Sequence, residues 1–133
     1  MTILKSFKLF ENSNNIINII NSTKIGDILD VDTIYKYVKK IHGDSDFING
    51  DLGKRIKKYK KYKLVEINIK DLNIDEYYLF DELVSKYIKK YKENNYYPPI
   101  VITDDFILID GNHRSNSLNK LGIKKIKAFK GIK

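Results

Sequence analysis

A short polar run near the end of the chain has residue types and a spacing suited to phosphate chemistry. Residues 110–114 read Asp-Gly-Asn-His-Arg, directly after the apolar residues 106–109. A helix start leaves backbone N–H groups unpaired and carries a partial positive charge. A glycine just before it lets an anion approach the backbone closely. The run therefore predicts an anion site, although polar strand–turn–helix junctions are also common without a ligand.

Three side chains of the run suit different steps of such chemistry. Arg114 offers a planar fork of donors that matches phosphate oxygens. His113 can donate a hydrogen bond or transfer a proton near neutral pH, so we take it as a candidate catalytic residue. Asp110 can hold a divalent cation that a nucleotide would bring, and is a candidate for both metal binding and catalysis. The predicted phosphate- or nucleotide-binding residues are Gly111, Asn112, His113, Arg114 and Ser115.

The elements that must position these residues are a strand and a short helix. Residues 106–109 form a continuous apolar run, as expected of a strand that is covered on both faces. The helix is predicted to start near His113, with Leu118 and Leu121 on its inner face. Gly122 then stands where a left-handed residue commonly ends a helix.

Three segments of the chain resemble the ParB/sulfiredoxin-like domain family. They are P-P-I-V-I at 98–102, I-L-I-D-G-N-H-R at 107–114 and L-G-I at 121–123. Members of that family carry an apolar P-I-V-V strand, an I-D-G-x-H-R turn and helix, and an L-G pair before the closing strand. The resemblance covers residues 64–129, about half of the chain, and no motif that we can place covers the part before it.

The resemblance implies both a fold and a function. The fold is a compact single domain of the α/β (α+β) class, with a small mixed sheet flanked by helices. The resemblance places this domain at residues 64–133, and we expect residues 1–63 to form an N-terminal helical extension packed on it. The function implied is nucleotide binding at the G-x-H-R turn, as in the free-serine kinases and the partition proteins that bind and hydrolyse CTP. In free-serine kinases a catalytic carboxylate lies near the first strand, which makes Glu66 the candidate here.

Departures from the family pattern narrow the expected activity. Sulfiredoxins use a cysteine at the position of Asn112, and this chain has no cysteine, so thiol-based repair chemistry is excluded. Partition proteins carry glutamate at Asn112 and arginine at His113. The form with histidine is nearest to the free-serine kinases and to phage or plasmid relatives. We therefore expect a phosphotransferase or nucleoside triphosphatase that binds ATP, ADP or CTP with Mg²⁺.

A second hypothesis rests on charge. The formal net charge is +8 and the pI about 9.4, which suits polyanionic partners. An AT-rich genome, which favours lysine over arginine, explains the same composition. Residues 54–63 are predicted to form a basic helix with a narrow apolar stripe at Ile56, Tyr59 and Tyr62. Such a helix could bind DNA or RNA, with or without nuclease activity. The alternative is that its basic face is simply exposed to solvent. The candidate nucleic-acid-binding residues are Lys54, Arg55, Lys57, Lys58 and Lys61.

A third hypothesis is a catalytically inactive interaction protein of phage or plasmid origin, because Asn112 departs from the family pattern. We find no membrane span and no signal-peptide pattern, and expect a cytoplasmic protein that does not bind membranes. His42, in the last turn of a predicted helix, is given a structural role favoured by the helix dipole. The remaining predicted elements are short helices within 1–23, helices at 30–42 and 81–94, a loop at 43–53, and strands at 64–70, 100–102 and 123–129.

Overall fold

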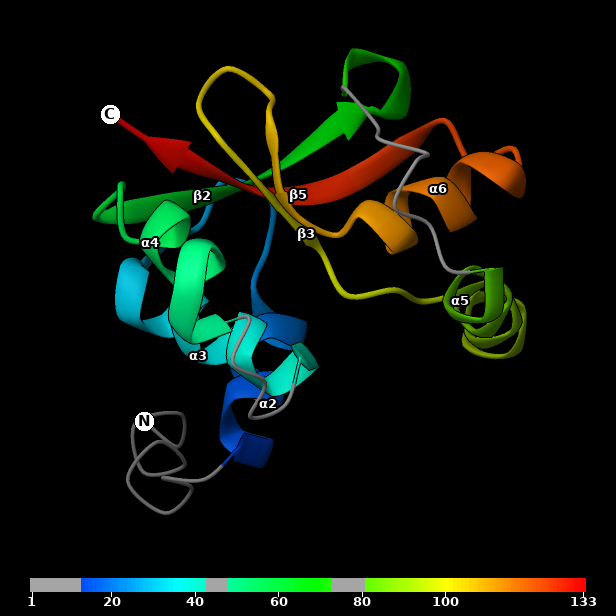
Figure 1. Cartoon of the computed structure of the whole chain (residues 1–133), viewed down its shortest axis with the longest axis horizontal. Helices are drawn as coiled ribbons and strands as arrows, with labels where there is room; N and C mark the ends of the chain where they lie inside the picture. The colour runs from blue at the N-terminus through cyan, green and yellow to red at the C-terminus, as the bar shows by residue number, and fades with distance from the viewer. Residues whose placement is uncertain (1–12, 43–47, 73–80) are drawn as a thin grey trace.

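A five-stranded mixed sheet lies at the centre of the molecule, with helices on both of its faces (Figure 1). The computed structural model describes residues 13–42, 48–72 and 81–133. The strand order is β1-β2-β5-β3-β4; β3 and β5 are parallel, and the other neighbours are antiparallel. This confirms the predicted small mixed sheet flanked by helices. The strands are β1 (Ile28–Asp30), β2 (Lys61–Asn68), β3 (Ile100–Ile102), β4 (Leu108–Asp110) and β5 (Lys125–Ile132).

The helices divide between the two faces of the sheet. Figure 1 shows α2, α3 and α4 grouped beneath one end of β2, whereas α5 and α6 lie together at the other end. No helix in the described ranges is long and apolar enough to cross a membrane. The α-helices are α2 (Ser13–Ser22), α3 (Val31–His42), α4 (Gly53–Ile56), α5 (Asp81–Asn94) and α6 (Asn112–Lys120), with a π-helical turn at Ile48–Leu52 and a 3-10 turn at Ile69–Asp71.

Each face of the sheet buries its own apolar cluster. On the first face, Leu64 of β2 lies opposite Phe129 of β5, and both pack with side chains of α2, α3 and α4. On the second face, Ile126 and Ala128 pack with Leu118 of α6. Side chains of a strand alternate between faces, so the register of β2 and β5 decides which residues enter which cluster.

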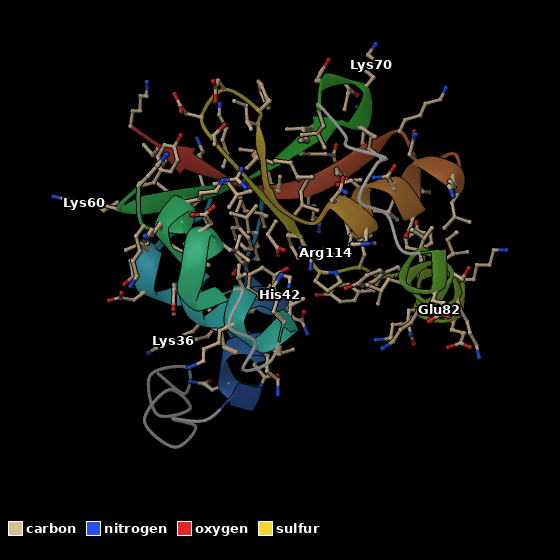
Figure 2. All side chains as sticks on the ribbon, in the orientation of Figure 1. Lys36, His42, Lys60, Lys70, Glu82 and Arg114 are labelled. Carbon is tan, nitrogen blue, oxygen red and sulfur yellow. The ribbon has the colours of Figure 1, made fainter. Side chains whose placement is uncertain are left out.

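Helix α3 confirms the predicted helix at 30–42. The Oδ1 of Asp30 accepts a hydrogen bond from the backbone N–H of Thr33 at 2.9 Å, which satisfies a donor of the first turn. Ile34, Tyr37 and Val38 form its buried side. His42 is the last residue of α3, and Figure 2 shows it near the centre of the molecule. Helix α3 matters for the site because it positions this histidine.

The predicted basic helix at 54–63 is wrong. Helix α4 ends at Ile56, and strand β2 begins at Lys61. Tyr62 is fully buried and its hydroxyl donates to the carbonyl of Ile56 at 2.6 Å, closing the turn between the two elements. The spacing of Tyr62 fits the apolar stripe of a helix, but Tyr62 and Leu64 also fit the alternation of a strand. Pairing with β5 decides in favour of the strand.

The strand before the polar turn is shorter than predicted. It spans only Leu108–Asp110, and β4 is an edge strand, so Ile107 is 50% exposed instead of covered on both faces. Phe106 has a φ of 65° and belongs to the preceding turn. The predicted helix at 81–94 is confirmed as α5, and its Leu83 is 38% exposed.

The part of the chain before residue 64 contains more than helices. Strand β1 was not predicted, and it pairs with β2 at the edge of the sheet. Helix α2 falls within the predicted helical segment 1–23, of which residues 1–12 lie outside the described residues, as do residues 43–47 of the predicted loop. The last strand runs over Lys125–Ile132 instead of 123–129.

Candidate functional site

The predicted strand–turn–helix is present, and Gly111 makes the turn. Asp110 ends β4, Gly111 has φ 117° and ψ 24°, and α6 begins at Asn112. A Cβ on Gly111 would lie 2.4 Å from Cγ2 and 2.8 Å from Cβ of the buried Ile100. Only glycine fits both this conformation and this space. No side chain caps the helix, so its first turn presents backbone N–H groups at the end of β4.

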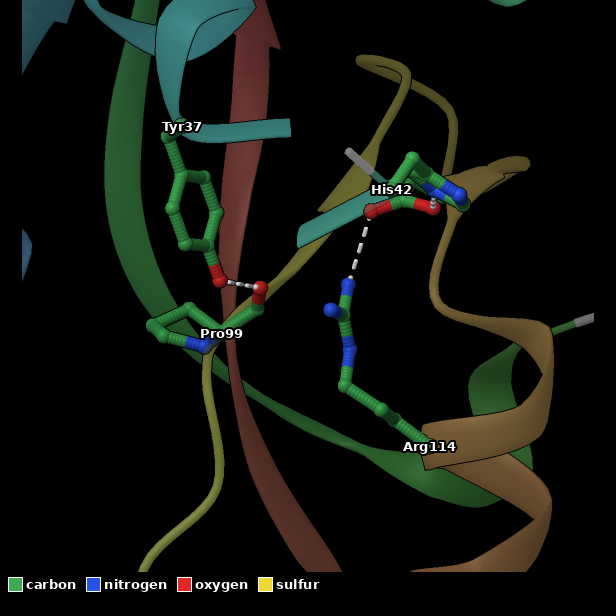
Figure 3. A network of polar contacts seen from close by, with 5 residues as sticks. Tyr37, His42, Pro99 and Arg114 are labelled. Carbon is green, nitrogen blue, oxygen red and sulfur yellow. Dashed lines mark hydrogen bonds and ion pairs between the residues drawn. The ribbon is translucent and has the colours of Figure 1, made fainter. Parts of the chain in front are cut away.

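Asp110 is the centre of a buried ion-pair network. Its Oδ1 lies 2.6 Å from Nε2 of His42, and its Oδ2 accepts a hydrogen bond from Nη2 of Arg114 at 2.8 Å. Only 7% of the Asp110 side chain and 2% of the Arg114 side chain are exposed. His42 comes from α3 and Arg114 from α6, and Figure 3 shows the two side chains approaching each other. The network therefore ties α3 to the turn.

The electrostatics of the network keep Asp110 ionised. Burial by itself would raise the pKa of this carboxyl, but the charge of Arg114 and the hydrogen bond from His42 outweigh burial and hold the pKa below its ordinary value of 3.8. The same ion pair raises the pKa of Arg114 despite its burial. An ionised carboxylate only accepts hydrogen bonds, so Nε2 of His42 carries the proton between them. The stability from Asp110 is present above the ordinary carboxyl pKa and is lost as the pH falls through the lowered value.

Two polar atoms of the first turn of α6 are buried without a partner. Among the described residues, Nε of Arg114 and Oγ of Ser115 have no hydrogen bond. The next residues of the helix are also buried and polar, but they are satisfied: Nδ2 of Asn116 donates to the Asn112 carbonyl at 2.8 Å, and Oγ of Ser117 donates to the His113 carbonyl at 2.6 Å. Unpaired buried donors cost free energy, and native structures contain few of them.

Two tyrosine side chains lie near enough to the buried guanidinium to feel its charge. Tyr37, on α3, is fully buried and donates its hydroxyl proton to the Pro99 carbonyl (Figure 3). Burial raises its pKa, which the nearby charge of Arg114 lowers in part. Burial likewise raises the pKa of Tyr96, again against the charge of Arg114, although Tyr96 is 46% exposed. The guanidinium thus lies in a low-dielectric environment, where its charge acts strongly on an anion nearby.

His113 stands beside the network in a more exposed position. Its side chain is half-buried, and burial lowers the pKa of its imidazole, as does the charge of His42, against an opposing effect of Asp110. His113 is therefore neutral at pH 7, and a neutral imidazole can accept a proton. The chain has two histidines, and the structure brings both to Asp110.

The lowered pKa of His113 has a consequence for stability. As the pH falls from about 7 to 5, the unfolded chain protonates this imidazole near pH 6.5, whereas the folded chain keeps it neutral to lower pH. The free energy of unfolding should therefore decrease over this range. Urea denaturation at several pH values checks this, and His113→Gln should flatten the decrease. An unchanged pH profile in the variant would exclude His113 as its source.

The other predicted site residues lie elsewhere. Glu66 is exposed on β2, and the strand order separates β2 from β4 by three inter-strand spacings, roughly 14 Å. The structure does not bring this carboxylate to the turn. Arg55 is half-buried and donates from Nη2 to the Leu108 carbonyl at 2.7 Å, which links α4 to β4. The predicted nucleic-acid-binding lysines are all exposed: Lys54, Lys57, Lys58 and Lys61.

Metal binding by Asp110 stays a prediction. Both of its oxygens already have partners, and the described residues contain no group of three or more metal-ligating side chains. Mg²⁺ is commonly held by one or two carboxylates together with substrate phosphates, so a nucleotide would supply part of the coordination. The residues present fit an ion that arrives with its nucleotide better than one bound by the protein alone.

Sequence reasoning missed the role of His42. This residue lies 68 positions before Asp110, and its place at the end of a helix suggested only a dipole interaction. Figure 2 shows His42 and Arg114 in the middle of the molecule, where α3 approaches α6. The one available signal was that histidine occurs only twice in the chain.

Comparisons with known proteins give structural similarities only. No protein-family profile matches the chain, and no curated protein matches it. A Pnob8-like ParB-N domain is similar with 26% identity and a TM-score of 0.43, over 52% of this chain and 29% of that one. Sulfiredoxin from Arabidopsis thaliana is similar with 18% identity and a TM-score of 0.45, over 50% of this chain and 82% of that one.

Proposed function

We propose that this protein binds a nucleotide through its phosphates at the turn 110–115 and acts as a phosphotransferase or nucleoside triphosphatase. One observation carries the proposal: the first turn of an uncapped helix holds a buried guanidinium with an unpaired Nε, next to an unpaired buried serine hydroxyl. Buried polar atoms without hydrogen bonds destabilise the folded state, and folded proteins retain them most often at functional sites.

The arrangement favours an anion at the start of α6. Backbone N–H groups of the first turn and the helix dipole attract negative charge there. Arg114 adds a full positive charge from within the protein, fixed in direction by its ion pair with Asp110. Its contribution is thus chiefly electrostatic, because only 2% of the side chain is exposed. His113, which is more exposed, is the side chain best placed to touch a bound phosphate.

The same residues supply the remaining parts of phosphoryl transfer. That reaction depends mainly on positioning and on stabilising negative charge. His113 is neutral at pH 7 and is our candidate for accepting a proton from the attacking hydroxyl or water. Asp110 holds His42 by a 2.6 Å contact, so a second imidazole is oriented beside the first. The nucleotide would bring Mg²⁺, which neutralises phosphate charge.

A thermal-shift screen tests binding. The protein is heated with ATP, ADP, CTP, GTP or serine, each with and without Mg²⁺. A ligand at one hundred times its dissociation constant stabilises the folded state by about 2.7 kcal/mol, which is readily measured. One nucleotide should raise the melting temperature, and inorganic pyrophosphate should compete with it. The absence of a shift with every nucleotide would contradict the proposal.

Activity is tested separately with His113→Ala. Phosphate release or transfer should fall by about 10²–10⁴-fold, as for loss of a general acid or base, while the protein stays folded. Lys120→Ala, in the last turn of the same helix and exposed, is the matched control and should keep full activity. Unchanged turnover in His113→Ala would remove the catalytic assignment without affecting the binding result.

A further inference from the structure

Lysine side chains meet on one face of the sheet, away from the turn described above. Lys63 of β2 lies directly opposite Lys130 of β5, and Lys61 comes two residues before Lys63 on the same face. Lys61 and Lys63 are exposed, whereas Lys130 is half-buried with its Nζ 5.0 Å from the centroid of the Phe106 ring. Three cations thus share a small area of two neighbouring strands.

Exposed apolar side chains border these lysines. Ile28 of β1 lies opposite Lys63 and is 54% exposed; Ile132 of β5 lies opposite Lys61 and is 37% exposed. We call Lys61, Lys63, Lys130, Ile28 and Ile132 together the open sheet face. Helix α6 does not cover it, because Figure 1 places α6 at the opposite end of β2 and β5.

The open sheet face departs from what folding alone favours. Like charges directly opposite each other on neighbouring strands destabilise a sheet. Asp30 lies opposite Lys61 on β1 and accepts the Thr33 amide of α3, and Asp104 accepts the Tyr59 hydroxyl at 2.5 Å and lies 3.6 Å from Lys133, so neither carboxylate stands between Lys63 and Lys130 in the strand register. A polyanionic partner would relieve the repulsion between Lys63 and Lys130.

We propose that the open sheet face binds single-stranded nucleic acid. Its lysines are spaced by about 5 Å across the strands and about 7 Å along them, a scale that suits successive phosphates of an extended strand. The two isoleucines offer apolar contacts to unstacked bases, which a duplex does not present. The net charge of +8 would bring such a strand to the protein. This inference does not depend on the proposed nucleotide site.

Fluorescence anisotropy with labelled oligo-dT and oligo-rU of 20 nucleotides tests the proposal, over a range of salt concentrations. The informative variant is Lys61→Gln combined with Lys63→Gln. The matched control is Lys89→Gln combined with Lys90→Gln, which removes the same charge from exposed positions of α5 at the other end of the molecule. A melting curve of each variant checks that it is folded.

The first variant should bind about tenfold more weakly at 100 mM salt, and the slope of log K against log salt should become shallower by about 1.4, the value for two phosphate contacts of a single strand. The control should bind as the unmodified protein does. Equal loss in both variants would assign binding to net charge and overturn the proposal. So would equal affinity for a 20-base-pair duplex, or no binding at low salt.

Discussion

Replacing Arg114 by alanine should lower the free energy of unfolding by about 3–5 kcal/mol. The guanidinium and the Asp110 carboxylate are both buried and share a 2.8 Å hydrogen bond. Truncating one partner leaves the other charge buried, with His42 as its remaining contact, and an uncompensated buried charge is strongly destabilising. The substitution is therefore a poor probe of ligand binding, because it weakens the fold itself.

Urea denaturation measures this effect, with Lys120→Ala as an exposed control on α6 that should change stability by less than about 0.5 kcal/mol. A double variant separates the ion pair from the packing of the long side chain. Arg114→Met combined with Asp110→Leu removes both charges and keeps most of the volume, so it should be more stable than Arg114→Ala. If the double variant is less stable than Arg114→Ala, the unpaired charge is not the cause of the loss.

Replacing Gly111 by alanine should cost about 3 kcal/mol or more. An alanine at φ 117° is strained, and its Cβ would lie 2.4 Å from Cγ2 of Ile100. Ile100 is fully buried in β3 and is held by pairing with β5, so it cannot move away without disturbing the sheet. The turn must open, which displaces the first turn of α6 and the ion pair that starts from it.

Gly122→Ala is the matched control for this substitution. Gly122 also has a positive φ, 80°, but nothing lies within 4 Å of the position where a Cβ would stand. In Gly122→Ala the free energy of unfolding should fall only by the cost of backbone strain, about 1–2 kcal/mol. The difference between the two variants in denaturant unfolding therefore measures the contact with Ile100. Equal losses would show that Ile100 moves aside and that no tight contact with Ile100 restricts the turn.

Local signals in the sequence were enough to find the turn and the helix after it. Gly111 and Gly122 both have positive φ, and both were predicted from residue type and position alone. Helix α5 begins and ends at its predicted residues, because fourteen residues of helical spacing leave little ambiguity. These features depend on neighbours in the chain, which a single sequence records.

Features set by distant contacts were missed or mistaken. Tyr62 was predicted in a helix, but it lies in β2 because β2 pairs with β5. Strand β5 comes more than sixty residues later in the chain, so the local sequence around Tyr62 does not reveal this pairing. The contact of His42 with Asp110 likewise joins α3 to β4, and no local sequence pattern predicts it. Arg114 was expected to face a ligand directly, but the buried carboxylate beside it gives the guanidinium a structural partner as well.

Phosphate binding at the start of α6 is tested most directly by the chemical shifts of the backbone amides. The ¹⁵N-labelled protein is titrated with a nucleotide and Mg²⁺, and then with pyrophosphate. The backbone amides of Asn112, His113 and Arg114 should shift together, with saturation, and Lys120 should not. Shifts confined to the open sheet face, or no saturable shift in the first turn of α6, would contradict the nucleotide site.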